Sequence, residues 1–116
     1  MTTPADTLKA RIRADLTSAM KARDSAQASL LRVLLAALDN AEAVPIGSAH
    51  ERYQERAFGD PSAEVPRLVL TMEDVKALVA KERAEREAAA ADFERLGRPD
   101  DAEGLRQEAS WVARYL

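Results

Sequence analysis

The stretch LTMEDVKALVAKERAEREAAAADFERLGR, residues 70–98, decides the fold, because both of its ends carry the signals of a single long helix. Thr71 is a candidate N-cap with Asp74 three residues later, and Gly97 near the end is followed within two residues by a proline. A hydroxyl cap favours the start of a helix, and glycine followed by proline favours its end. We therefore predict one helix over residues 72–96.

The apolar stripe of this helix is interrupted in the middle. Glu82 and Arg86 occupy central positions of a face that is otherwise apolar at helical spacing. Two explanations are open. The two side chains form an ordinary intrahelical pair, which contributes about 0.2–0.5 kcal/mol. Alternatively, Glu82 accepts from a buried Arg32 on another helix, with Arg86 alongside, and this interior ion pair fixes the register of the helices.

Three further helices are expected from the same kinds of signal. A hydroxyl before a proline predicts a helix over residues 4–22, and a fresh cap at Asp24 predicts the next one over 25–43. The second of these helices is apolar nearly all round, so we expect it to be central and Arg32 to be buried with an acceptor. A proline followed by two acids predicts the last helix, over 99–115.

The connection between the second and third helices, residues 44–70, differs in composition and contains several turn signals. A capping box at Ser48 suggests a short helix over residues 49–57, and His50, the one histidine, is expected to be an ordinary surface residue. Short joints make neighbouring helices antiparallel. The fold expected for residues 1–116 is therefore a single all-α, four-helix antiparallel bundle-like domain with one long loop.

Size and composition restrict the classes of protein that fit. The chain has 116 residues, enough for one hydrophobic core, and no cysteine, so it forms no disulfide and has no thiolate site. It contains no apolar run of about 18 residues and begins with a charged amphipathic pattern, so neither a membrane span nor secretion is expected. These features fit a cytoplasmic protein.

The sequence contains no recognisable catalytic motif. Its four glycines are scattered and form no phosphate-binding loop, and there is no HExxH sequence and no serine elbow. The many carboxylates lie on amphipathic helices, where pairing with Lys or Arg is the ordinary arrangement. We therefore expect no catalytic residue, no metal site and no cofactor.

Net charge gives little support to a general affinity for nucleic acid. The chain carries 17 basic and 20 acidic side chains, for a net charge of −3, whereas nucleic-acid modules are usually basic. Residues 1–40 are mildly basic, with six Lys or Arg against four Asp. Any contact with nucleic acid must therefore depend on a local patch.

Four segments of the chain resemble a known family. They are residues 8–24, 30–43, 70–86 and 93–116. In chain order they contain the motif residues Leu31-Arg32, Asn40-Ala41-Glu42, Lys81-Glu82, Arg86, Phe93, Gly97-Arg98 and Tyr115-Leu116. In order and spacing they resemble the YqeY-like family. Its domain is similar to the tail domain of the B subunit of the tRNA-dependent amidotransferases.

The resemblance implies a role beside tRNA and not a catalyst. Amidotransferases are carbon–nitrogen ligases that use glutamine as the amide donor, but their chemistry lies in other domains and subunits, while the tail helps to hold tRNA. The implied partners are tRNA or an amidotransferase subunit. Two departures stand out: family members usually continue into a second, smaller helical subdomain, and residues 44–69 form a longer insertion than the usual link.

Two functions follow as alternatives. The first is RNA binding through basic side chains of the first helix and of the turn after the long helix: Lys9, Arg13, Lys21, Arg23, Arg95 and Arg98. The ordinary interpretation of Lys9, Arg13 and Lys21 is a solvated flank whose stems cover the edge of the core. The second function is a protein-interaction adaptor that uses residues 44–69 and the exposed end of the last helix. An independent amidotransferase is least supported, since the sequence offers no nucleophile.

Overall fold

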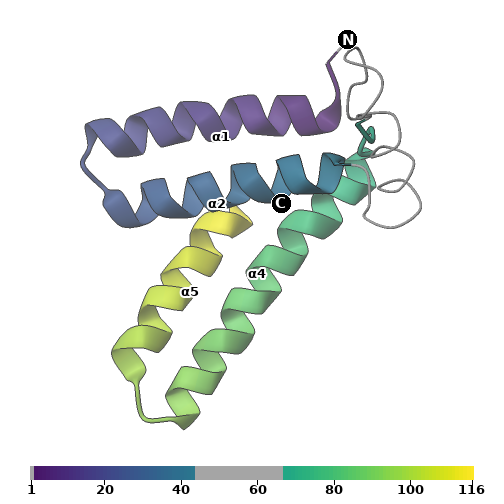
Figure 1. Ribbon diagram of the computed structural model, residues 1–116. Coiled ribbons are helices and arrows are strands. Elements are labelled where there is room, and N and C mark those ends of the chain that lie inside the picture. Colours follow the sequence, from purple (N-terminus) through teal and green to yellow (C-terminus); the bar gives the residue numbers. More distant parts are fainter. Residues whose placement is uncertain (1, 44–66) are drawn as a thin grey trace, which may run out of the picture.

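The computed structural model describes residues 2–43 and 67–116, which fold into four helices (Figure 1). These are α1 (Pro4–Lys21), α2 (Ser25–Glu42), α4 (Met72–Arg95) and α5 (Pro99–Ala113). The predicted all-α, four-helix fold is confirmed, with helix ends within one or two residues of those predicted. The short helix expected over 49–57 and His50 lie outside the described residues.

Side-chain caps set the start of three helices. Thr3 and Asp6 form a reciprocal capping box at α1, and Thr71 and Asp74 form another at α4. In each box the threonine hydroxyl accepts from the backbone N–H of the aspartate three residues later. The aspartate carboxylate in turn accepts from the backbone N–H of the threonine. Asp24 caps α2 by accepting from the Gln27 N–H at 3.1 Å. These contacts satisfy backbone donors that a helix cannot pair internally.

The long helix ends in a left-handed turn at Gly97, whose φ is +74°. The Gly97 N–H donates to the carbonyl of Glu94 at 3.0 Å, and the Arg98 N–H donates to the carbonyl of Phe93 at 2.8 Å. This pair of bonds is a Schellman motif, which glycine favours because it has no Cβ to clash. The turn reverses the chain directly into α5.

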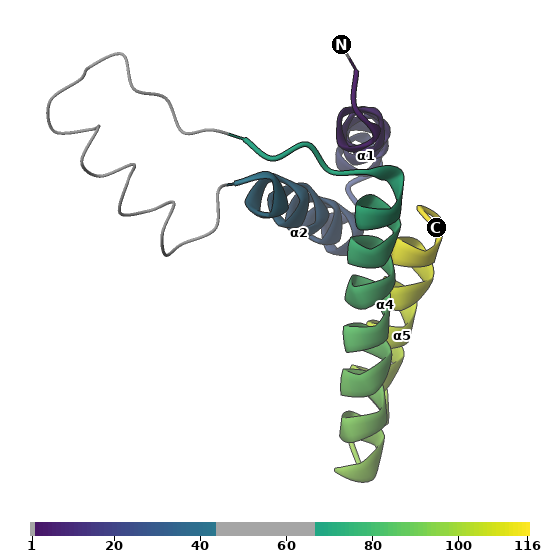
Figure 2. The ribbon, with the colours of Figure 1, turned by 90° about the vertical axis from the view of Figure 1, so that its right-hand side faces the viewer.

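The four helices form two antiparallel hairpins, α1–α2 and α4–α5 (Figure 1). The α4–α5 hairpin is inclined to the α1–α2 hairpin and extends away from it, as both views show (Figures 1 and 2). The molecule measures 54 × 32 × 26 Å. The two hairpins meet where the first turns of α4 and the last turns of α5 lie against α1 and α2.

The core lies at this junction. Its fully buried large side chains come from all four helices: Ile12, Leu31, Leu34, Leu38, Val79 and Val112. Burying each such side chain stabilises the fold by about 1.5–3 kcal/mol. Farther along the α4–α5 hairpin, the buried contacts are made by alanines, among them Ala90, Ala102 and Ala109. The hairpin far from the junction is therefore packed closely but has little apolar volume.

One detail of the predicted core is wrong. Helix α2 was expected to be buried nearly all round, but Arg32 is exposed and Val33 is 48% exposed. Val33 lies on the face of α2 opposite Leu31, Leu34 and Leu38, and Arg32 lies at the edge of the buried stripe. Helix α2 is therefore central to the core along one face and solvated along the other. Among the described residues, no helix is both long and apolar enough to cross a membrane.

Candidate nucleic-acid interface

The basic side chains of the two hairpins are in different electrostatic surroundings. On α4 and α5 most of them form ion pairs with a neighbouring carboxylate: Lys81, Arg83, Arg86, Arg95, Arg98 and Arg106. On α1 and in the turn after it, Arg13, Lys21 and Arg23 are exposed and form no ion pair with any residue that the structure describes. The unneutralised positive charge therefore lies mainly on the α1–α2 hairpin.

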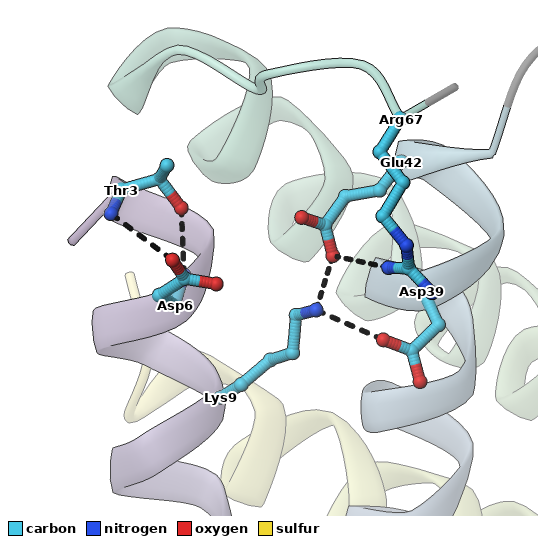
Figure 3. Close-up of polar contacts among 6 residues, drawn as sticks. All are labelled: Thr3, Asp6, Lys9, Asp39, Glu42 and Arg67. Atoms are coloured by element: carbon cyan, nitrogen blue, oxygen red, sulfur yellow. Dashed lines mark hydrogen bonds and ion pairs between the residues drawn. The ribbon is translucent and has the colours of Figure 1, made fainter. Parts of the chain in front are cut away.

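Lys9 was predicted to be an exposed contact for RNA, and this prediction is wrong. It is only 5% exposed and is directed into the space between α1 and the end of α2 (Figure 3). Its ammonium donates to Asp39 Oδ1 at 2.9 Å and forms an ion pair with Glu42, which is also buried. Burial of a charged amine requires such partners. Lys9 is therefore held between α1 and α2 and is not part of the exposed basic surface.

The titration of this cluster follows from its contacts. Burial alone lowers the pKa of Lys9, but hydrogen bonds to Glu42 and Asp39, together with their charges, outweigh it, and the net pKa is raised. The hydrogen bond from Lys9 lowers the pKa of Asp39 despite some desolvation. Both shifts favour the charged forms. Lys9 and Asp39 are therefore both charged at neutral pH.

The Lys9 cluster also holds the chain where it returns to the helices. Arg67 Nη1 lies 3.8 Å from Glu42 Oε1 (Figure 3), and the Leu68 N–H donates to the Glu42 carbonyl at 2.7 Å. Ala43 and Arg67 form an isolated antiparallel bridge. The two ends of the described chain on either side of residues 44–66 are therefore paired with each other.

Sequence symmetry could have identified this cluster. Lys9 lies 15 residues before Asp24, which begins the second arm of the hairpin, and Asp39 lies 15 residues after it. Residues at equal distances from the turn of an antiparallel hairpin lie opposite each other. From this symmetry, Asp39 and Glu42 at the end of α2 could have been predicted as partners of Lys9.

Glu82 and Arg86, which interrupt the apolar stripe of α4, form the intrahelical pair that was one of the two explanations. Arg86 also makes a second contact, to α5. Arg86 Nη1 donates to Glu82 Oε2 at 2.8 Å, which is the intrahelical pair. Arg86 Nε donates across to Glu108 of α5 at 3.2 Å. The proposed buried pair between Arg32 and Glu82 is wrong, because Arg32 is exposed and donates to Met20 Sδ at 3.3 Å. Arg86 joins α4 to α5, and Glu82 orients it.

Arg95 and Arg98 lie at the α4–α5 turn, far from Lys21 and Arg23 at the α1–α2 turn (Figure 1). Arg95 is paired with Asp92, and Arg98 with Asp101 at 2.6 Å. Arg98 also lies over the ring of Phe93, 5.1 Å from its centroid. The six predicted RNA contacts therefore do not form one surface.

At the other end of α5, Tyr115 anchors the helix to α1. Its hydroxyl donates to Asp15 Oδ2 at 2.5 Å, and Arg11 lies over its ring at 4.9 Å. Arg11 Nη2 also donates to the carbonyl of Arg114 at 2.8 Å. Burial, and then the bond to Asp15, raise the pKa of Tyr115 well above its usual value, so the hydroxyl stays protonated.

Among the described residues, no group of three or more His, Asp or Glu side chains is arranged to hold a metal ion. No family model, curated protein or solved structure matches this chain.

Proposed function

We propose that the protein is a non-catalytic, cytoplasmic accessory module of the YqeY-like kind that binds RNA, with tRNA as the expected ligand. The observation that supports this most is the contrast in charge between the hairpins: Arg13, Lys21 and Arg23 have no carboxylate partner among the described residues, whereas the cations of the α4–α5 hairpin are mostly paired. Unpaired surface cations are the ordinary means of contacting phosphates.

Three exposed cations lie close together at the α1–α2 turn. Arg23 and Arg32 line a shallow hollow of about 280 Å³ beside Met20, and Lys21 is adjacent to it in sequence. The one acid in the lining, Asp24, accepts from a backbone N–H as the cap of α2. Arg32 was not among the predicted RNA contacts, and it joins them here because it is exposed.

The test is fluorescence anisotropy with labelled tRNA over a salt series. We expect binding at about 50 mM salt that weakens as salt rises, because each phosphate contact contributes roughly −0.7 to −0.9 to the slope of log K against log salt. The variant Lys21→Gln/Arg23→Gln should bind at least about tenfold more weakly and show a shallower slope, by roughly 1–2 units.

The matched control is Arg95→Gln/Arg98→Gln, which removes two arginines from the other turn. It should change tRNA affinity much less, because both side chains are already paired with aspartates. Equal losses for the two double variants would contradict the assignment of the surface. Absence of any tRNA binding at low salt would remove the proposed function.

The alternative function, a protein-interaction adaptor without RNA binding, is favoured by exposed apolar residues at the return of the chain. Leu68 is 44% exposed and Val69 is 73% exposed, next to each other before α4. Co-purification with an amidotransferase subunit would support this alternative, provided that deleting residues 46–66 abolished the association and the protein showed no tRNA binding.

A further inference from the structure

A hollow of about 400 Å³ lies where the first turns of α1 and α4 meet Tyr115. The starts of α1 and α4 lie at the same end of the molecule (Figures 1 and 2). This end is opposite the α1–α2 turn, so the hollow is separate from the proposed RNA contacts. A role for the hollow therefore does not depend on RNA binding.

The floor and walls of the hollow are largely apolar. Apolar groups come from three elements: Pro4 and Leu8 of α1, Met72 and Val75 of α4, and the ring of Tyr115. Met72 is 54% exposed, although it lies beside the core residue Val75. The Tyr115 hydroxyl is occupied by its bond to Asp15, so the ring is the part that remains for a ligand. An apolar side chain would bury area against each of these groups.

The charged groups lining the hollow all have the same sign. Arg11 and Lys76 are its two charged residues, and its remaining polar lining consists of threonines from the start of α1. No carboxylate lines it, although the chain has a net charge of −3. Lys76 is exposed and forms no ion pair with any described residue. Arg11 is held in place by the Arg114 carbonyl and the Tyr115 ring.

We propose that this hollow docks an acidic amphipathic helix of a partner protein. An apolar side chain of that helix would enter the space beside Met72 and Val75, and carboxylates one turn away would pair with Arg11 and Lys76. Charge complementarity selects this occupant, because a basic helix would place like charges against both cations. The arrangement is the helix-in-groove mode, in which anchors recur every three or four residues.

The test uses a synthetic helical peptide of about 18 residues, or five turns, with leucines along one stripe and glutamates elsewhere. Its matched probe has the same leucines with lysines in place of the glutamates. Binding is followed by NMR titration of the ¹⁵N-labelled protein. We expect the acidic peptide to bind, with shifts centred on Thr7, Met72 and Lys76, and the basic peptide to bind at least about tenfold more weakly, a difference of about 1.4 kcal/mol.

Two variants change the hollow while leaving the fold intact. Lys76→Glu reverses an exposed charge, and Met72→Glu places an acid in the first turn of α4, where acids are favourable. Each should weaken the acidic peptide at least about tenfold. The control Lys81→Glu reverses an exposed charge of α4 outside the hollow and should leave the affinity unchanged.

Three results would overturn the proposal. The first is no binding of the acidic peptide, and the second is equal binding of the two peptides or shifts centred on another surface. The third is concentration-dependent self-association by sedimentation that Met72→Glu abolishes, which would assign the hollow to a second copy of the chain. RNA binding is measured separately and bears on none of these outcomes.

Discussion

Lys9 remains a cation in a buried position because the end of α2 supplies two carboxylates within reach of its ammonium. The arrangement is specific, because Asp39 and Glu42 are three residues apart and so lie on the same side of α2. Replacing Lys9 leaves the buried Glu42 carboxylate without its nearest counter-charge. The energetic effect therefore depends on what is left behind more than on what is removed.

Lys9→Ala should lower the free energy of unfolding by about 3–5 kcal/mol, because it leaves the buried Glu42 carboxylate with only the exposed Arg67 guanidinium, 3.8 Å away. The double variant Lys9→Met/Glu42→Met should recover most of this loss, since apolar side chains of similar volume need no counter-charge. Urea denaturation measures both, and Lys21→Ala, on the exposed side of α1, should stay within about 0.5 kcal/mol of the parent. A loss below about 1 kcal/mol for Lys9→Ala would contradict the structural role of the cluster.

Stability should also depend on pH at both extremes. The pKa of Asp39 is below its usual 3.8, so its contribution is present above that value and is lost as pH falls through the lowered pKa. The pKa values of Lys9 and Tyr115 are raised above 10.5 and 10.0, so their contributions are complete below those values and are lost as pH rises toward the folded-state values. The unfolding free energy measured against pH should therefore be flat near neutrality and fall at both ends.

Two variants separate the alkaline contributions. Tyr115→Phe should remove the loss of unfolding free energy that begins near pH 10. Lys9→Met/Glu42→Met should remove the loss that begins at slightly higher pH. An alkaline loss unchanged by both variants would show that other groups cause it.

At the level of single residues, the sequence predicted side-chain environments less well than helices. Lys9 and Arg32 were assigned opposite environments to those they have, since Lys9 is buried and Arg32 is exposed. Both lie at the edge of an apolar stripe, where a small rotation of the helix decides burial. That rotation depends on the partner helix, which periodicity within one helix does not reveal.

Helix ends, in contrast, were predictable because their chemistry is local. Thr3, Asp24 and Thr71 cap their helices through bonds that span three residues, and Gly97 ends α4 through bonds of similar range. Each signal is therefore contained within about one turn of sequence. The helix ends could therefore be predicted without knowledge of the tertiary packing.

The two glycines of the α4–α5 hairpin should respond in opposite ways to the same substitution. Gly97→Ala should destabilise the protein by about 1 kcal/mol, because its φ of +74° is strained for a residue with a Cβ. Gly104→Ala should stabilise it by about 0.4–1 kcal/mol, because the site is helical and a Cβ there meets no atom within 4 Å. Thermal or urea unfolding of both variants measures the difference, and equal signs would contradict the turn geometry.

On the scale of the whole molecule, the number of helices and their pairing into hairpins followed from sequence, but the inclination of the hairpins did not. That inclination depends on contacts between residues far apart in the chain, such as Tyr115 with Asp15 and Arg11 with Arg114. Such pairs carry no periodic signal.

The two hairpins should also differ in how readily they open. The turn end of α4–α5 packs mainly through alanines and ion pairs, whereas α2 contributes large, fully buried side chains. Hydrogen exchange followed by mass spectrometry should therefore show faster exchange in residues 88–104 than in residues 30–38. Arg86→Ala should increase exchange near the turn, because it removes the link to Glu108. Equal protection of both regions would contradict a separate opening of the hairpin.

The bridge between Ala43 and Arg67 has a practical consequence for engineering. Because the chain leaves and re-enters the helices at neighbouring positions, the distance that any connecting segment must span is almost independent of its length. Closing a loop half or twice as long changes the entropy term by only about 0.6 kcal/mol. The position between Ala43 and Arg67 is therefore an insertion site. A fluorescent reporter or a binding domain with adjacent termini could be inserted there without moving the four helices.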